Sequence, residues 1–182
     1  MTAQARDGLI FDDAPWLYDR HRPGYPDTAV AALVELARLV KSSRVLEVGA
    51  GTGQLTTKLL DRGLTVTAIE PGARMAVLLR GKLSANPSAS VVESRFEEAT
   101  RLTGTFDAVV SSTAFHWVDP DRRYDLAARV LRDRGSLENH RRLPSARRNA
   151  LLGEIRPFVT EELGDRFVDR YVTTVCVGRK RG

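Results

Sequence analysis

The sequence predicts an α/β fold: a doubly wound, mostly parallel β-sheet flanked by helices, with a reduced C-terminal half. Three observations support this prediction. Strand-like apolar runs alternate with helix-like segments at short spacing through residue 132, a pattern typical of parallel sheets with right-handed crossovers. A turn with glycine at positions 49, 51 and 53 joins the first strand to the next helix. After Leu131 the alternation stops and the chain becomes polar.

The composition is that of one ordinary globular domain. The chain has 182 residues, of which 42% are hydrophobic and 28% are charged, and this length suffices for one sizeable core. Its apolar stretches are too short to cross a bilayer, and residues 1–13 lack the apolar centre of a signal peptide. Cys176 is the single cysteine, which excludes an internal disulfide and a cysteine-based metal cluster. We therefore expect a cytoplasmic protein with no membrane partner and no metal.

The net charge is +5, and the excess of basic residues lies after residue 120. Arg141, Arg142, Arg147, Arg148 and the end Arg179-Lys180-Arg181 contribute to it. Aromatic residues do not interleave with these arginines, so the pattern favours a solvated helix surface over a nucleic-acid face. We expect no nucleic-acid partner.

Four strands are expected in the first 112 residues. Each is a short apolar run, and the first and fourth are apolar enough to be buried inside a parallel sheet. The expected strands span residues 44–48, 64–70, 89–93 and 106–112. Because ligands bind beyond the carboxyl ends of such strands, the residues that follow them should converge on one crevice.

Amphipathic segments predict helices between these strands. Asp27 is expected to cap the first helix, and Pro71-Gly72 to open the third. Asp119-Pro120 is expected to start the last. The expected helices span residues 27–40, 54–62, 73–83 and a segment that begins at 119.

One domain with three parts is expected. Residues 1–26 are a lead-in or lid, residues 27–135 are the core, and residues 136–182 are a truncated C-terminal end of the same domain.

The polar segment 132–140 predicts that a fifth strand is missing, because it is too polar and short for an interior strand. Its loss would expose the ladder edge of the fourth strand, through which two copies could pair as a homodimer. A late helix over 143–162 and a terminal strand over 171–177 are expected in the remainder. That terminal strand could instead cover the open edge.

The segment 45–53 carries the strongest functional signal. A buried strand ends in the carboxylate Glu47, and a turn with glycine at every second position follows. A small polar ligand can lie against such bare main chain, near the amides of the next helix. The dinucleotide fingerprint does not fit, because its third glycine would fall at Gln54. Glu47 would repel a pyrophosphate but attract a cationic ligand; alternatively, it is an exposed strand-end carboxylate.

This segment resembles motif I of the class I S-adenosylmethionine-dependent methyltransferases. Residues 106–120 resemble the fourth-strand region of the type 11 small-molecule methyltransferases, and the likeness covers residues 14–135. The resemblance implies a Rossmann-like fold and S-adenosylmethionine as cofactor, whose sulfonium and amino groups suit a carboxylate. It implies that the cofactor is bound by Glu47, Gly49, Ala50, Gly51 and Gly53.

Further cofactor contacts are expected after the second, third and fourth strands. Glu70, followed by Pro71, can accept both hydroxyls of a ribose, or it is a charge that stabilises the next helix N-terminus. The resemblance places Phe96 and Glu97 beside the adenine, although Phe96 could equally be core and Glu97 could face water. Ser111, at the end of the fourth strand, completes the expected crevice.

The resemblance places His116 and Trp117 at the mouth of the methyl-transfer crevice. His116 could act as a general base, because an imidazole titrates near neutral pH, or it forms a wall of the substrate pocket. Tyr18 and Arg22 lie in a lead-in that resembles the family's Tyr…Arg-Pro-x-Tyr-Pro segment, which can fold over the cofactor as a lid. Arg22 would then pair with the methionine carboxylate. The alternative is a proline-constrained connector.

The leading hypothesis is methyl transfer from S-adenosylmethionine to a small-molecule acceptor. This in-line displacement needs positioning and exclusion of water more than an acid–base pair. A shortened cofactor-binding protein without catalysis is the alternative. An NAD-dependent oxidoreductase is disfavoured by Gln54 and Glu47, and an RNA methyltransferase rests only on the C-terminal arginines.

Overall fold

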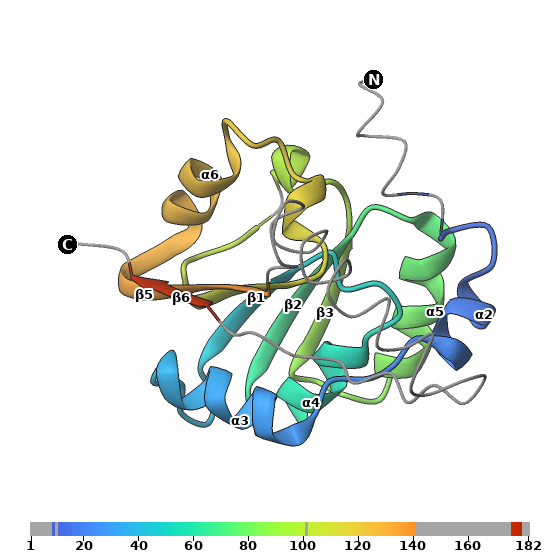
Figure 1. Ribbon diagram of the computed structural model, residues 1–182, viewed down its shortest axis with the longest axis horizontal. Coiled ribbons are helices and arrows are strands. Elements are labelled where there is room, and N and C mark those ends of the chain that lie inside the picture. The colour runs from blue at the N-terminus through green and yellow to red at the C-terminus, as the bar shows by residue number, and fades with distance from the viewer. Residues whose placement is uncertain (1–8, 10, 101, 141–175, 180–182) are drawn as a thin grey trace, which may run out of the picture.

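The computed structural model describes residue 9 and residues 11–100, 102–140 and 176–179, and Figure 1 shows their arrangement. The helices are α2 (Pro15–His21), α3 (Asp27–Leu36), α4 (Gln54–Leu60), α5 (Ala73–Leu83) and α6 (Arg123–Val130), with the short 3-10 helices η1 (Phe96–Glu98) and η2 (Phe115–Trp117). The strands are β1 (Arg44–Val48), β2 (Thr65–Glu70), β3 (Ala89–Glu93), β4 (Phe106–Ser112), β5 (Leu131–His140) and β6 (Cys176–Arg179).

The described strands form one sheet in the order β3-β2-β1-β4-β5-β6. The strands β1 to β5 pair in parallel, and β6 pairs antiparallel with β5. The direction of winding changes between β1 and β4, which is the point where doubly wound sheets bind ligands. The predicted doubly wound, mostly parallel fold is confirmed.

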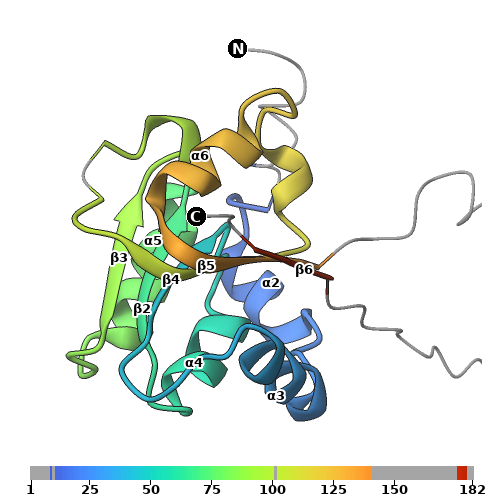
Figure 2. The same cartoon turned by 90° about the vertical axis from the view of Figure 1, so that its left-hand side faces the viewer.

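Helices cover both faces of this sheet. One hydrophobic core lies against α3, α4 and α5, and the other against η1, η2 and α6; Figure 2 shows α6 on the opposite side from α3 and α4. Along β1, Val45 belongs to the first core and Leu46 to the second, because successive side chains of a strand point to opposite faces. Among the helices that the structure describes, none combines the length and apolarity that a membrane span requires.

The first four strands are confirmed to within one residue, and α5 spans the expected residues. The N-terminus of α3 differs from the prediction. Pro26, not Asp27, occupies its N-cap, and Asp27 is the first helical residue. The Asp27 carboxylate instead pairs with Nζ of Lys58 in α4 at 2.6 Å.

Three helix boundaries lie inside the expected ones. α3 ends at Leu36 rather than at residue 40, because Arg38 has a left-handed φ of 56°. α4 ends at Leu60 rather than at residue 62. α6 begins at Arg123, because the preceding residues turn around Asp119, whose carboxylate accepts a hydrogen bond from an amide two residues later at 2.9 Å.

The prediction that the fifth strand is missing is wrong. β5 runs parallel to β4, with Ser136 opposite Ala108 and His140 opposite Ser112. Both edges of β4 are therefore paired, and the reason to expect a homodimer through that strand is removed. The expected terminal strand is represented by β6, which covers β5; residues 171–175 of it and the late helix lie outside the described residues.

Main-chain pairing explains why this polar segment is a strand. A sheet ladder uses backbone groups, which every residue except proline supplies in full. The register shifts between Phe106 and Ala108 of β4, so β5 can carry extra residues such as the buried Gly135. Leu131 and Leu137 supply contacts to the core. β5 also crosses the boundary between residues 135 and 136, where the core was expected to end and the truncated C-terminal part to begin.

Candidate cofactor site

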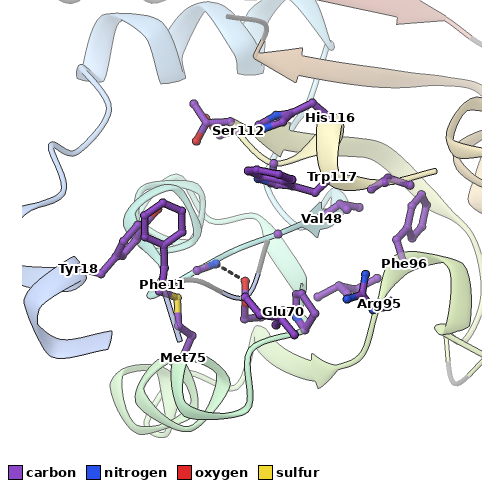
Figure 3. A pocket seen from close by; sticks show the side chains of 18 of the residues that line it. Phe11, Tyr18, Val48, Glu70, Met75, Arg95, Phe96, Ser112, His116 and Trp117 are labelled. Carbon is purple, nitrogen blue, oxygen red and sulfur yellow. Dashed lines mark hydrogen bonds between the residues drawn. The ribbon is translucent and has the colours of Figure 1, made fainter. Parts of the chain in front are cut away.

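A pocket opens at the carboxyl ends of β1, β2 and β4. About 1060 Å³ of empty space, including open solvent, lies between its walls. In Figure 3, Tyr18 and Phe11 lie on one side of it and Trp117 and His116 on another. The described lining residues are Leu9, Phe11, Tyr18, Arg22, Val48, Gly49, Gly51, Ile69, Glu70, Pro71, Met75, Arg95, Phe96, Glu97, Ser112, Thr113, Ala114, His116, Trp117 and Val118.

The glycine turn contributes the stretch of bare main chain to this pocket. A Cβ added at Gly49 would lie 2.2 Å from the Cβ of Ala114, and one at Gly51 would lie 3.5 Å from the Tyr18 ring. The φ angles are left-handed, at 73° for Gly49, 59° for Gly51 and 93° for Gly53, which favours glycine. Gly49 and Gly51 line the pocket; the described lining does not include Ala50 or Gly53.

Glu70 connects the glycine turn to the loop after β2. Its Oε2 accepts a hydrogen bond from the Gly51 amide at 2.8 Å, the dashed line in Figure 3, and its Oε1 accepts one from the Gly72 amide at 2.9 Å. Burial raises the pKa of Glu70, and these two hydrogen bonds oppose the rise. Each carboxylate oxygen keeps a further lone pair. Glu70 and its neighbour Pro71 both line the pocket, so Glu70 can also accept hydrogen bonds from a ligand.

Glu47 lies beneath the turn, and the described pocket lining does not include it. Its side chain is 2% exposed, and its Oε2 accepts a hydrogen bond from Oγ1 of Thr56 in α4 at 2.6 Å. Burial raises the pKa of Glu47 to about 8; the Thr56 hydrogen bond opposes this rise, and the charge of Glu70 adds to it. The alternative of an exposed strand-end carboxylate is therefore wrong.

The N-terminal segment brings both expected lid residues to the pocket. Tyr18 packs against Phe11 with ring centroids 5.2 Å apart. Nη2 of Arg22 donates a hydrogen bond to Oγ1 of Thr113, in the loop after β4, at 2.7 Å. This segment therefore spans from the glycine turn to the loop after β4.

The wall after β3 holds Phe96 and Glu97. Phe96 is 6% exposed and belongs to the pocket lining and to the hydrophobic core. Oε1 of Glu97 accepts a hydrogen bond from the Asp119 amide at 2.8 Å, which ties this wall to the segment before α6. Ser111 is not in the described lining: its Oγ donates to the Val48 carbonyl oxygen at 2.8 Å, and Ser112 lines the pocket instead.

His116 and Trp117 form the wall that η2 contributes. Their ring centroids are 4.4 Å apart, with the rings tilted by 42°, and both line the pocket. A general-base role for His116 stays a prediction. In the described part of the chain, no group of three or more histidine, cysteine, aspartate or glutamate side chains is placed to bind a metal ion.

Several lining residues were not indicated by the sequence. Thr113 and Ala114 directly follow a predicted strand, so their position carried a usable signal. Phe11 carried none, because it reaches the pocket only when the N-terminal segment folds back; Met75 lies in the first turn of α5, just after β2. Asp12 fixes that fold: its carboxylate accepts a hydrogen bond from the Met75 amide at the start of α5 at 2.9 Å.

The fold and the pocket together define a class of protein. A doubly wound sheet with a glycine turn after the first strand and a carboxylate after the second is typical of nucleoside-cofactor binding. Residues 46–138 match the family model described as a methyltransferase domain. The chain belongs to the class I S-adenosylmethionine-dependent methyltransferases. The predicted family, and S-adenosylmethionine as its cofactor, are thereby confirmed.

Curated relatives agree with this assignment. An uncharacterized methyltransferase of Mycobacterium tuberculosis is 42% identical over 138 residues, which are 75% of this chain and 54% of that protein. A malonyl-[acyl-carrier protein] O-methyltransferase of Geobacter sulfurreducens is 36% identical over 99 residues, 53% of this chain and 37% of that protein. The chain thus spans about half the length of the mycobacterial relative.

Solved structures share the fold. A phosphoethanolamine N-methyltransferase of Haemonchus contortus, in complex with S-adenosylhomocysteine, has a TM-score of 0.65 at 16% identity and covers 88% of this chain and 44% of its own. The [4+2]-cyclase SpnF has a TM-score of 0.63 at 18% identity and covers 76% of this chain and 60% of its own. At these identities the similarity establishes the fold alone.

Proposed function

We propose that this protein transfers a methyl group from S-adenosylmethionine to a small-molecule acceptor. One observation carries the proposal: the Glu70 carboxylate is fixed by the Gly51 and Gly72 amides beside bare main chain, and it faces the pocket. A cyclase shares the fold, so the fold alone does not define the reaction; the site and the family support methyl transfer.

The pocket residues fit the proposed cofactor. Gly49 and Gly51 offer a surface without side chains, and the free lone pairs of Glu70 suit two ribose hydroxyls. Pro71 and Phe96 supply apolar contacts for an adenine in the same pocket. When bound, S-adenosylmethionine supplies a methyl group on a positively charged sulfur, which is activated for in-line displacement.

Tyr18 and Arg22 are proposed to enclose the methionine end. The guanidinium of Arg22 has five N–H donors, so it can bind a carboxylate while it keeps its hydrogen bond to Thr113. Glu47 is proposed to act from below: through Thr56 it connects the end of β1 to α4 and so supports the turn between them.

The acceptor is proposed to enter beside His116 and Trp117. The Trp117 ring, packed against His116, helps to exclude water from the displacement. An ionised carboxylate acceptor needs no base, whereas a hydroxyl or ammonium acceptor must lose a proton. A general-base role for His116 therefore applies only to the second kind of acceptor.

Titration calorimetry with S-adenosylmethionine, S-adenosylhomocysteine and NAD tests the cofactor. We expect the first two to bind and NAD not to bind, because Gln54 occupies the position where the dinucleotide fingerprint needs its third glycine. S-adenosylhomocysteine release is then measured with a panel of carboxylic acids, phenols and amines. A protein that binds neither sulfur compound at millimolar concentration contradicts the proposal, and binding without turnover on the panel supports the alternative of an inactive cofactor-binding protein.

A further inference from the structure

A cluster of polar side chains lies outside the pocket lining and joins α2 to the glycine turn. Oδ1 of Asp19 accepts hydrogen bonds from Oγ1 of Thr52 at 2.7 Å, from Nε2 of Gln54 at 3.3 Å and from Nζ of Lys82. Lys82, in α5, also donates to the Thr52 carbonyl oxygen at 2.9 Å. We call Asp19, Thr52, Gln54 and Lys82 the Asp19 cluster.

The Asp19 cluster connects directly to residues of the pocket. Thr52 lies between Gly51 and Gly53 and is fully buried, with 0% exposure. Asp19 follows Tyr18, whose ring lies 3.5 Å from the position of a Cβ at Gly51. A bond between Asp19 and Thr52 therefore fixes the Tyr18 ring beside the bare main chain of the turn.

Polar contacts account for much of the attachment of α2. All residues of α2 are described and none of them is buried, so its apolar contacts come from partly buried side chains such as Tyr18, which packs on Phe11. An exposed ion pair contributes little to stability, but the Asp19 and Lys82 side chains are only 28% and 33% exposed, and one carboxylate serves three donors. Burial opposes ionisation of Asp19, yet the Lys82 and Thr52 hydrogen bonds outweigh it and lower its pKa.

We propose that Asp19 is a positioning residue that fastens α2 to the glycine turn and thereby holds Tyr18 and Arg22 at the cofactor pocket. This inference rests on the proposed function, since it concerns the same pocket. Its consequence is specific: loss of Asp19 releases α2 and weakens cofactor binding, while the two hydrophobic cores keep their contacts.

The test compares Asp19→Asn and Lys82→Met with the control variant Asp27→Asn. Asp27 forms an ion pair with Lys58 at 2.6 Å that joins α3 to α4 and not α2 to the turn, and the Asp27 side chain is 76% exposed. The dissociation constant of S-adenosylhomocysteine is measured for each in low and high salt. We expect roughly tenfold weaker binding for both test variants and less than about twofold change for the control. High salt should weaken wild-type binding more than binding by Asp19→Asn.

Trypsin cleavage gives a second measurement that a purely structural effect would not reproduce. Arg20 is a cleavage site near the end of α2, whereas Arg22 precedes Pro23 and is not cleaved. We expect faster cleavage at Arg20 in Asp19→Asn than in wild type or Asp27→Asn, and protection of the wild type by S-adenosylhomocysteine. Thermal unfolding curves should show that Asp19→Asn and Asp27→Asn are both fully folded at the temperature of the binding and cleavage measurements.

The outcomes separate this inference from the proposed function. If wild type does not bind S-adenosylhomocysteine, the proposed function fails. If wild type binds it and the Asp19 and Lys82 variants bind and are cleaved like Asp27→Asn, only the positioning role of Asp19 is overturned.

Discussion

At the scale of single residues, two carboxylates define the pocket in different ways. Burial raises the pKa of both Glu47 and Glu70. Glu70 accepts hydrogen bonds from two backbone amides and lines the pocket. Glu47 accepts a hydrogen bond from the Thr56 hydroxyl and lies below the pocket. A cationic ligand nearby would favour the ionised form of both. Both should therefore affect cofactor binding, but only Glu70 should contact the cofactor.

Glu70→Gln should weaken S-adenosylhomocysteine binding by about 10- to 100-fold, because hydrogen bonds to a charged group contribute about 1.5–3 kcal/mol. The glutamine amide nitrogen would also face one of the two backbone amides as a second donor. Titration calorimetry measures the change. Glu93→Gln is the matched control: Glu93 lies opposite Glu70 in the β3 register and forms an exposed pair with Arg80 at 3.1 Å. Equal affinities of the two variants would contradict a ligand-binding role for Glu70.

Glu47→Gln should change how stability depends on pH. In the folded protein Glu47 keeps its proton up to about pH 8, whereas its ordinary pKa is 4.5. Its contribution to the free energy of unfolding is therefore fully present below pH 4.5 and is lost as the pH rises through 8. The neutral glutamine has no such loss. The stability of the variant relative to wild type, measured by thermal unfolding, should therefore increase from pH 5 to pH 8. A stability difference that does not change with pH would contradict the raised pKa.

At the scale of elements, the loop after β4 packs directly onto the glycine turn after β1. Ala114 occupies the place where a side chain at Gly49 would be, and Thr113, with a φ of 55°, turns the chain beside it. Thr113 also accepts the hydrogen bond from Arg22. The loop after β4 therefore also holds Arg22, the C-cap residue of α2.

Gly49→Ala should lower the free energy of unfolding by about 2–4 kcal/mol, because its φ of 73° is unfavourable for alanine and its Cβ would lie 2.2 Å from that of Ala114. Gly81→Ala is the control. Apart from its chain neighbours and the backbone of α5 itself, no described atom lies within 4 Å of the Cβ position at Gly81, so this change should stabilise by about 0.5–1 kcal/mol. Chemical unfolding measures both; similar effects of the two changes would contradict the packing described.

At the scale of the whole molecule, the pocket is assembled from segments far apart in the sequence. The N-terminal segment, the glycine turn and the loops after β2, β3 and β4 each supply part of its wall. A ligand that contacts all of them can bind only when they are folded together, so binding should stabilise the fold.

S-adenosylhomocysteine at a hundredfold excess over its dissociation constant should stabilise the fold by about 2.7 kcal/mol, which corresponds to a Tm increase of roughly 5–10 °C for a chain of this size. NAD at the same concentration is the control and should cause no shift. Differential scanning fluorimetry measures both. Equal shifts with the two compounds would contradict selection of the sulfur-containing cofactor.

The sequence by itself determined the order of the first four strands along the chain, the glycine turn and Glu70, because these depend on local periodicity and on backbone freedom. It did not determine β5, since a polar strand is stabilised by main-chain pairing with β4, which leaves little apolar pattern. Nor did it place Glu47 beneath the turn, Ser112 rather than Ser111 at the pocket, or Phe11 beside Tyr18. Only the tertiary structure decided those positions, because each depends on which neighbouring segment covers the residue.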